Sequence, residues 1–188
     1  HTVFALPFAL MAALVASNGS LGGRVLFWVL VAMIGARTSA MTFNRIVDRR
    51  IDAQNPRTAG RALPAGAVSV YEAWALMTVA TALFIVAAWQ LNPLALILSP
   101  VALAVVWGYS YTKRYTKWSH AVLGLSLAIA PVGAWVAVTG GISTSVLWLA
   151  AGVLAWVAGF DIIYSLSDIE FDWEHSLHSM PSRWGPKR

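Results

Sequence analysis

The sequence predicts an all-α fold, a polytopic membrane helical bundle with about six transmembrane helices. Of the 188 residues, 59% are apolar and only 11% are charged, against about 25% charged residues in soluble domains. The apolar residues form stretches that approach the roughly twenty residues needed to cross a bilayer. Turn-forming sequences such as Asn92-Pro93 and Gly140-Gly141 separate these stretches.

Six apolar spans follow one another along the chain. The second is interrupted by Arg37, and the sixth contains Asp161 near its end. Pro100 and Pro131 lie inside spans, which membrane helices tolerate when neighbouring groups satisfy the freed carbonyl. The chain has no cysteine, so it offers neither a disulfide framework nor a thiolate metal site. The predicted spans are residues 2–16, 25–43, 71–89, 93–109, 121–138 and 144–165.

Basic residues occupy alternate connections between the spans. In the opposite connections Arg24 is the only basic residue. The positive-inside rule therefore predicts that the connections rich in basic residues are cytoplasmic. All eight acidic residues also lie at or near this side, although acids contribute little to orientation. A site that uses both signs of charge is therefore expected there. The basic residues follow the second, fourth and sixth spans: Arg45, Arg49, Arg50, Arg57, Arg61; Lys113, Arg114, Lys117; Arg183, Lys187, Arg188.

A polar ladder with steps of four residues ends the second span, at Asn44, Asp48 and Asp52. Residues four apart share one face of a helix. Magnesium prefers hard oxygen ligands and usually binds one or two carboxylates together with substrate phosphates. The ladder therefore suits magnesium, with the Asn44 carbonyl as a neutral third oxygen. The alternative is that both aspartates pair with neighbouring arginines on a solvated helix end.

A second ladder of the same spacing follows the sixth span, at Tyr164, Asp168 and Asp172. Carboxylates are costly beside lipid and usually mark a functional site there. Two matched pairs that face each other across a cavity could hold magnesium on one diphosphate. The two ladders together favour a metal-diphosphate site over surface charge.

Three segments around these ladders resemble the UbiA superfamily of intramembrane prenyltransferases, and most closely its bacterial members that prenylate 4-hydroxybenzoate. The first ladder matches the N-x3-D-x3-D motif of that family, and Asp168 with Asp172 matches its D-x3-D motif. The three segments, in family order, are GARTSAMTFNRIVDRRIDAQNPRTAGRALPAG, YSYTKRYTKWSHAVLG and DIIYSLSDIEFDWEHSLHSMPSRWG.

The resemblance implies one transmembrane prenyltransferase domain over residues 1–188, apparently truncated at both ends, since family members typically have nine membrane helices. It also implies a bacterial inner membrane location with the active-site loops cytoplasmic. The expected partners are an isoprenyl diphosphate, a small aromatic acid and the lipid bilayer. Nucleic acid is not expected, because the basic residues lie between apolar spans rather than along one exposed face.

The implied reaction is magnesium-dependent transfer of a polyprenyl group to a 4-hydroxybenzoate-like acid in quinone biosynthesis. Asp48, Asp52, Asp168 and Asp172 would be the catalytic metal-binding residues, with Asn44 as a further ligand. Magnesium would neutralise the diphosphate as it leaves, and the allylic carbon would then alkylate the ring. A hydroxynaphthoate acceptor of menaquinone biosynthesis is an alternative. A cation transporter is the alternative of another class, although transporter sites usually lie nearer the bilayer centre.

Basic residues near the ladders are candidates for binding diphosphate. Lys113 lies in the segment that resembles the basic motif of the family. Arg57 and Arg61 lie in the loop after the first ladder, and a guanidinium group suits phosphate oxygens. Ordinary loop solvation is the alternative for these two arginines. Arg114 and Lys117 are interpreted as positive-inside anchors.

Three residues inside the spans are candidates for binding the aromatic acceptor. Arg37 lies seven residues before Asn44, nearly on the same helix face, and could hold a carboxylate. An ion pair with Asp161 or snorkelling is the alternative. Asp161 and Tyr164 face inward by spacing and could orient the acceptor hydroxyl, with a helix-helix hydrogen bond as the alternative. His120 is interpreted as an interfacial residue.

Overall fold

The computed structural model describes residues 2–169, 174 and 178–185. The described residues form helices joined by turns and loops, with no strand, which confirms the predicted all-α membrane bundle. Five helices are long and apolar enough to cross a membrane, while the first is shorter. The elements are α1 (Thr2–Ala16), α2 (Gly23–Gln54), α3 (Val70–Leu91), α4 (Pro93–Tyr115), α5 (Ser119–Thr139), α6 (Thr144–Ser165), the 3-10 turn η1 (Leu166–Asp168) and α8 (Met180–Trp184).

Two helices continue beyond the ends that the apolar pattern predicted. Helix α2 runs past residue 43 to Gln54, and α4 runs past residue 109 to Tyr115. The loss of apolar residues marks the edge of the lipid and does not stop a helix. Helix α2 ends where Asn55 adopts an extended backbone, as expected for a residue that precedes proline. The first ladder consequently lies on a continuous helix.

Local capping explains where several helices begin. Ser69 and Glu72 form a capping box at the start of α3, which satisfies backbone N–H groups that have no partner within the helix. The Asn92 side chain caps α4, and Pro93 occupies its first turn, where a missing N–H costs nothing. The Ser143 side chain caps α6 in the same manner.

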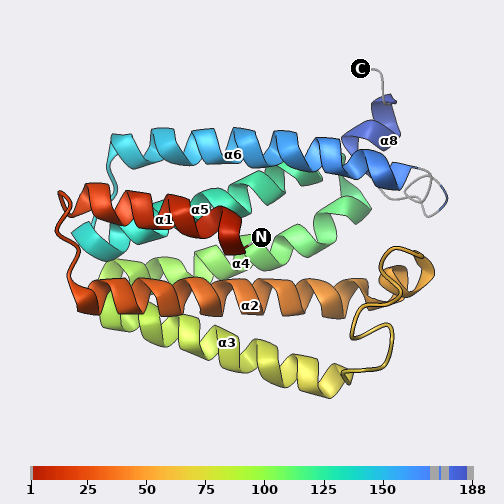
Figure 1. The fold of residues 1–188 in the computed structure, drawn as a ribbon, viewed down its shortest axis with the longest axis horizontal. Helices are drawn as coiled ribbons and strands as arrows, with labels where there is room; N and C mark the ends of the chain where they lie inside the picture. The colour runs from red at the N-terminus through yellow and green to blue at the C-terminus, as the bar shows by residue number, and fades with distance from the viewer. Residues whose placement is uncertain (1, 170–173, 175–177, 186–188) are drawn as a thin grey trace.

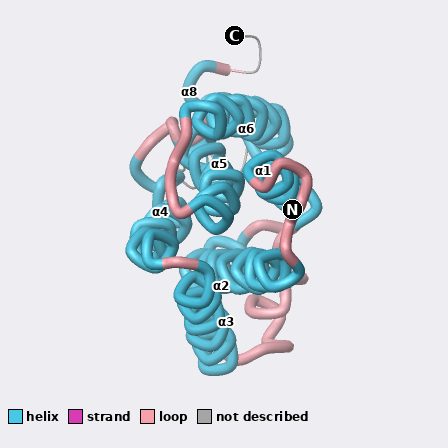
Figure 2. Tube along the Cα trace, turned by 90° about the vertical axis from the view of Figure 1, so that its left-hand side faces the viewer, coloured by secondary structure: helices cyan, strands magenta, loops and turns pink. Residues whose placement is uncertain are grey.

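The helices pack into a bundle whose functional connections share one end. Helices α2 and α3 lie side by side, α5 packs against α1, α4 and α6, and Figure 2 shows this arrangement nearly end-on. The loop after α2, the turn between α4 and α5, and α8 all lie at the end where α2 and α6 terminate (Figure 1). The three predicted basic connections therefore meet at one end of the molecule.

Close helix packing depends on small residues and a few polar contacts. A Cβ atom added to Gly124 of α5 would lie 2.4 Å from the Leu154 carbonyl oxygen of α6. Within the bundle, the Trp107 Nε1–H donates to Ser39 Oγ over 3.0 Å, and Ser39 Oγ lies 2.8 Å from Thr81 Oγ1. Small residues and hydroxyl groups are the usual means of joining helices in lipid. These contacts hold α2, α3 and α4 together around the site.

Candidate active site

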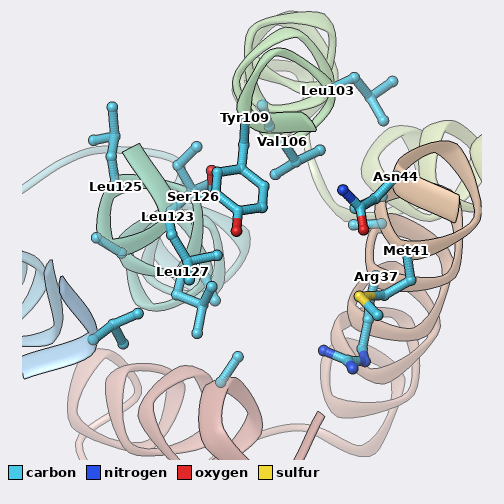
Figure 3. A pocket seen from close by; sticks show the side chains of 18 of the residues that line it. Arg37, Met41, Asn44, Leu103, Val106, Tyr109, Leu123, Leu125, Ser126 and Leu127 are labelled. Atoms are coloured by element: carbon cyan, nitrogen blue, oxygen red, sulfur yellow. The ribbon is translucent and has the colours of Figure 1, made fainter. Parts of the chain in front are cut away.

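A cavity of about 910 Å³ opens between the helices and is bordered by the loop after α2. This volume lies within the roughly 300–1,000 Å³ of typical ligand sites. The apolar part of the lining comes mainly from α4 and α5, including Leu103, Val106, Leu123 and Leu127 (Figure 3). Charged and polar residues of α2, α4, α6 and the loop line the rest. The cavity thus combines an apolar chamber with a polar end.

All three residues of the first ladder line this cavity, as their shared helix face predicts. Asn44 donates from Nδ2 to Asp48 Oδ2 over 2.9 Å. Arg114 Nη2 lies 2.9 Å from Asp48 Oδ1 and also donates to the Val47 carbonyl over 2.9 Å. Arg114, interpreted as a positive-inside anchor, thus has a contact within the site that the sequence did not predict. Its charge neutralises a ladder carboxylate within the cavity wall.

Asp52 is buried at the end of α2 and receives its main contact from the loop that follows. Arg61 Nη1 lies 2.7 Å from Asp52 Oδ1, and Arg45 Nη1 lies 3.7 Å from Oδ2. Thr58 donates its hydroxyl hydrogen to the Asp52 carbonyl over 2.9 Å, which fixes the loop on the helix end. The Asp52 Oδ2 atom is buried with no hydrogen-bond partner.

The residues present fit a magnesium ion at the first ladder. A buried carboxylate oxygen without a hydrogen-bond partner is unusual. Asp52 Oδ2 has the Arg45 nitrogen at 3.7 Å but no hydrogen bond, which leaves it available as a ligand for a cation. The carboxylates of Asp48 and Asp52 and the Asn44 amide oxygen are hard ligands of the kind that magnesium prefers. The described part of the chain contains no group of three or more acidic, histidine or cysteine side chains. The remaining ligands would therefore come from phosphate, water or the second ladder.

The second ladder is only partly described. Tyr164 lies in the last turn of α6, and Asp168 closes η1, although its side chain is not described. Asp172 lies outside the described residues. The backbone changes from α to 3-10 helix at Leu166, and a 3-10 helix has three residues per turn. The α-helix is therefore interrupted between Tyr164 and Asp168, and the shared face of the whole ladder stays a prediction.

The loop after α2 reaches across to α6 through Arg57. Arg57 Nη1 donates to the Tyr164 hydroxyl over 2.8 Å, and its guanidinium carbon lies 5.2 Å from the Tyr164 ring centroid. Its backbone N–H donates to Asn55 Oδ1 over 2.9 Å. Arg57, Arg61 and Lys113 all line the cavity. The structure thus brings the three predicted diphosphate-binding residues to one cavity.

The three predicted acceptor-binding residues also line the cavity. Figure 3 shows the Arg37 guanidinium projecting from α2 into it, on the same side as Met41 and Asn44. Asp161 does not pair with Arg37 but lies against His120, with Oδ2 2.7 Å from His120 Nδ1. Since the His120 side chain is fully buried, its interpretation as an interfacial residue is wrong.

The structure adds cavity residues that the sequence analysis did not assign. Tyr109 projects from α4 into the cavity (Figure 3). It lies four residues before Lys113, and this spacing on one helix face could have identified it. Arg45 and Arg114 also line the cavity. They lie next to Asn44 and Lys113 in sequence, and only the packed bundle shows which arginine each aspartate meets.

Comparison with known proteins gives a consistent result. The chain is 30% identical over 184 residues to the 4-hydroxybenzoate octaprenyltransferase of Shewanella amazonensis, covering 98% of this chain and 63% of that protein. The corresponding protein of Albidiferax ferrireducens is 33% identical over 163 residues, covering 87% of this chain and 55% of that protein. The chain thus spans less than two thirds of the length of these curated relatives.

Solved structures share the fold. The apo structure of a UbiA homolog from Aeropyrum pernix K1 superposes with a TM-score of 0.91 at 42% identity, covering 100% of this chain and 70% of that one. A UbiA homolog from Archaeoglobus fulgidus bound to DMAPP and Mg2+ gives a TM-score of 0.81 at 21% identity, covering 100% and 67%. The profile of the UbiA prenyltransferase family matches residues 5–188. The chain therefore belongs to the UbiA prenyltransferase family.

Proposed function

We propose that the intact protein transfers a polyprenyl group from an isoprenyl diphosphate to an aromatic acid of the 4-hydroxybenzoate type, with magnesium as cofactor. The observation that carries this proposal is the convergence of carboxylates, arginines and a lysine at the polar end of a largely apolar cavity. A diphosphate with an isoprenyl tail has the same division into a charged head and an apolar chain.

The first ladder would bind the magnesium ion of the head group, and the basic residues would bind its phosphate oxygens. Asp48 and Asp52 would hold magnesium with help from Asn44, and Asp168 and Asp172 of the second ladder would complete the site. Bound magnesium would neutralise the negative charge that develops on the departing diphosphate. Arg57, Arg61 and Lys113 would hold phosphate oxygens by charge-assisted hydrogen bonds. Arg61 and Arg114 now neutralise the aspartates, so ligand binding would change their partners.

The reaction breaks the allylic carbon-oxygen bond, whose electron pair leaves with diphosphate. The allylic carbon then bonds to a ring carbon beside the phenolic hydroxyl, and that ring carbon loses its proton to the released diphosphate. Water would convert the reactive allylic group to an alcohol, so the apolar lining protects it. Arg37 would hold the carboxylate of the acceptor, while Asp161 and Tyr164 would orient its hydroxyl group.

The names of the curated relatives support 4-hydroxybenzoate as the acceptor over a hydroxynaphthoate, and family membership supports an enzyme over a cation transporter. The corresponding location is a bacterial inner membrane with the polar end of the cavity at the cytoplasmic side.

The test is transfer of a radiolabelled prenyl group in membranes that contain the intact protein, with both acceptors in competition and with or without magnesium. We expect labelled prenyl-hydroxybenzoate, and its formation should be lost in Asp48→Ala and Asp168→Ala. Glu72→Gln is the control, because it removes a carboxylate that does not line the cavity. Unchanged transfer in both aspartate variants would contradict the metal assignment, and a product from neither acceptor would contradict the proposed acceptor class.

A further inference from the structure

His120, at the start of α5, is a fully buried polar side chain to which the proposed mechanism gives no role. Its two ring nitrogens contact different parts of the protein. Nδ1 lies 2.7 Å from Asp161 Oδ2 on α6, and Nε2 lies 3.3 Å from the backbone nitrogen of Met180, the first residue of α8. The imidazole ring therefore joins α5, α6 and α8.

These contacts determine which ring nitrogen holds the proton. The Met180 N–H can only donate a hydrogen bond, so His120 Nε2 accepts it and is unprotonated. A neutral imidazole then has its hydrogen on Nδ1, and Nδ1–H donates to the Asp161 carboxylate. A hydrogen bond at one ring nitrogen commonly sets the role of the other in this way.

Asp161 is the member of the pair that reaches the cavity. It lines the same cavity as Arg37 and Tyr109, and 19% of its side-chain surface is accessible to solvent. Asp161 Oδ2 accepts one hydrogen bond, from His120. A carboxylate can accept several, so acceptor capacity remains. Asp161 can therefore receive a further donor from the cavity while His120 fixes its orientation.

We infer that His120 is a positioning residue, which holds the Asp161 carboxylate so that it accepts a hydrogen bond from the hydroxyl group of the aromatic acceptor. This inference rests on the proposed function. A hydroxyl that donates to a carboxylate gains electron density on its oxygen and on the neighbouring ring carbons, and one of those carbons forms the new bond. A rigid partner behind the carboxylate reduces the cost of ordering it when the substrate binds.

The contact with α8 links this pair to the diphosphate-binding end of the cavity. The His178 N–H donates to the Lys113 carbonyl over 2.8 Å, two residues before the Met180 N–H reaches His120. Residues 178–180 therefore join the end of α4 to the start of α5. This connection keeps Asp161 in a constant position relative to Lys113, and thus places the acceptor hydroxyl relative to the diphosphate.

The experiment compares three substitutions of His120 in membranes that contain the intact protein. His120→Asn places an amide N–H near the position of Nδ1 and can still donate to Asp161. His120→Gln places its amide near Nε2 and can serve only Met180, and His120→Leu serves neither. Initial rates are measured with the aromatic acid and the isoprenyl diphosphate varied separately, and the amount of folded protein is measured for each variant.

We expect His120→Gln and His120→Leu to lower kcat/KM for the aromatic acid at least about tenfold, with KM for the diphosphate within about twofold of the original. His120→Asn should recover most of the loss. Equal losses toward both substrates, no loss in His120→Gln, or no recovery in His120→Asn would overturn the inference, because a purely structural pair would not distinguish the two substrates.

A further variant tests the inference if the His120 variants do not fold. Asp161→Asn keeps an oxygen that accepts from His120 but lacks the carboxylate charge, so it should show the same selective loss toward the aromatic acid. Retention of full acceptor kinetics in Asp161→Asn would also overturn the inference. Absence of transfer by the unsubstituted protein would contradict the proposed function itself, and the role of His120 would then fall with it.

Discussion

Arg61 and Asp52 meet across the turn that ends α2, with Nη1 and Oδ1 2.7 Å apart. The arginine comes from the loop and the aspartate from the helix, so the contact holds the loop against the cavity wall. A magnesium diphosphate at this position would offer metal to Asp52 and phosphate to Arg61. The ion pair would therefore hold both groups in place for the ligand proposed above.

Replacement of Arg61 by glutamine should weaken binding of the isoprenyl diphosphate. Loss of a hydrogen bond to a charged group costs about 1.5–3 kcal/mol, which corresponds to a rise in KM of roughly tenfold to a hundredfold. The control is Arg49→Gln, since Arg49 donates to the Ile46 carbonyl and does not line the cavity. Steady-state kinetics with varied diphosphate measure both, and equal effects would argue against a role for Arg61.

Removal of magnesium should abolish prenyl transfer reversibly. The first ladder supplies hard oxygen ligands, and magnesium is bound through few protein ligands together with phosphate. Chelation by EDTA should therefore stop product formation, and added magnesium should restore it. Binding of the aromatic acid alone should change little, which a binding assay with labelled acid can check. Full activity in EDTA would contradict a metal-dependent reaction.

Replacement of Arg37 by glutamine should affect the aromatic acid selectively. Its guanidinium group projects into the cavity (Figure 3) and would pair with the acceptor carboxylate, so its loss should raise KM for the acid by roughly tenfold to a hundredfold. KM for the diphosphate should remain unchanged. A phenol without a carboxylate offers a matched comparison, because its slow prenylation should be equal in both proteins.

Replacement of Gly124 by alanine should destabilise the bundle. The new Cβ would lie 2.4 Å from the Leu154 carbonyl oxygen, and overpacking of this kind costs about 1–3 kcal/mol. Gly152→Ala on α6 is the control, since an added Cβ there meets nothing within 4 Å. Thermal unfolding in detergent should show a lower transition temperature for the first variant only.

The orientation of the bundle can be tested with single cysteines, because this chain contains none. Ala67 lies in the exposed loop after α2, and Ser20 is exposed in the connection between α1 and α2. We expect a membrane-impermeant thiol reagent to label Ser20→Cys in intact cells and Ala67→Cys only in inverted membrane vesicles. The opposite pattern would place the site on the other side of the membrane.

The repetition of apolar spans was sufficient to predict helices α1 to α6 and their order, but not η1 or α8. It was insufficient for the ends of α2 and α4, because a helix continues through polar sequence when it leaves lipid. The apolar pattern ended the second span at residue 43, whereas α2 continues to Gln54, two residues before Pro56. The fold class depends on hydrophobic length, whereas the precise bounds depend on local backbone conformation.

Much of the candidate site could also be predicted, since steps of four residues placed Asn44, Asp48 and Asp52 on one face. Neighbouring arginines were predicted as alternative partners, and Arg45 Nη1 does lie 3.7 Å from Asp52 Oδ2, but the contacts from Arg61 and Arg114 were not predicted. Arg114 contacts Asp48 only because α4 packs beside α2, since the two residues are 66 positions apart in the sequence. His120 was misassigned for the same reason, because its partner Asp161 lies on another helix.

The length of α2 has a consequence for how a substrate is obtained. Its 32 residues span about 48 Å, whereas the hydrocarbon layer is about 30 Å thick. If the hydrocarbon layer begins at Gly23, the first twenty or so residues suffice to cross it, which would place Asn44 near its edge and Asp52 at the depth of lipid head groups. An isoprenyl diphosphate dissolved in the same leaflet already has its head at this depth and its tail in hydrocarbon. As the donor of the proposed reaction, it would enter by lateral diffusion, and neither part would have to change its solvent.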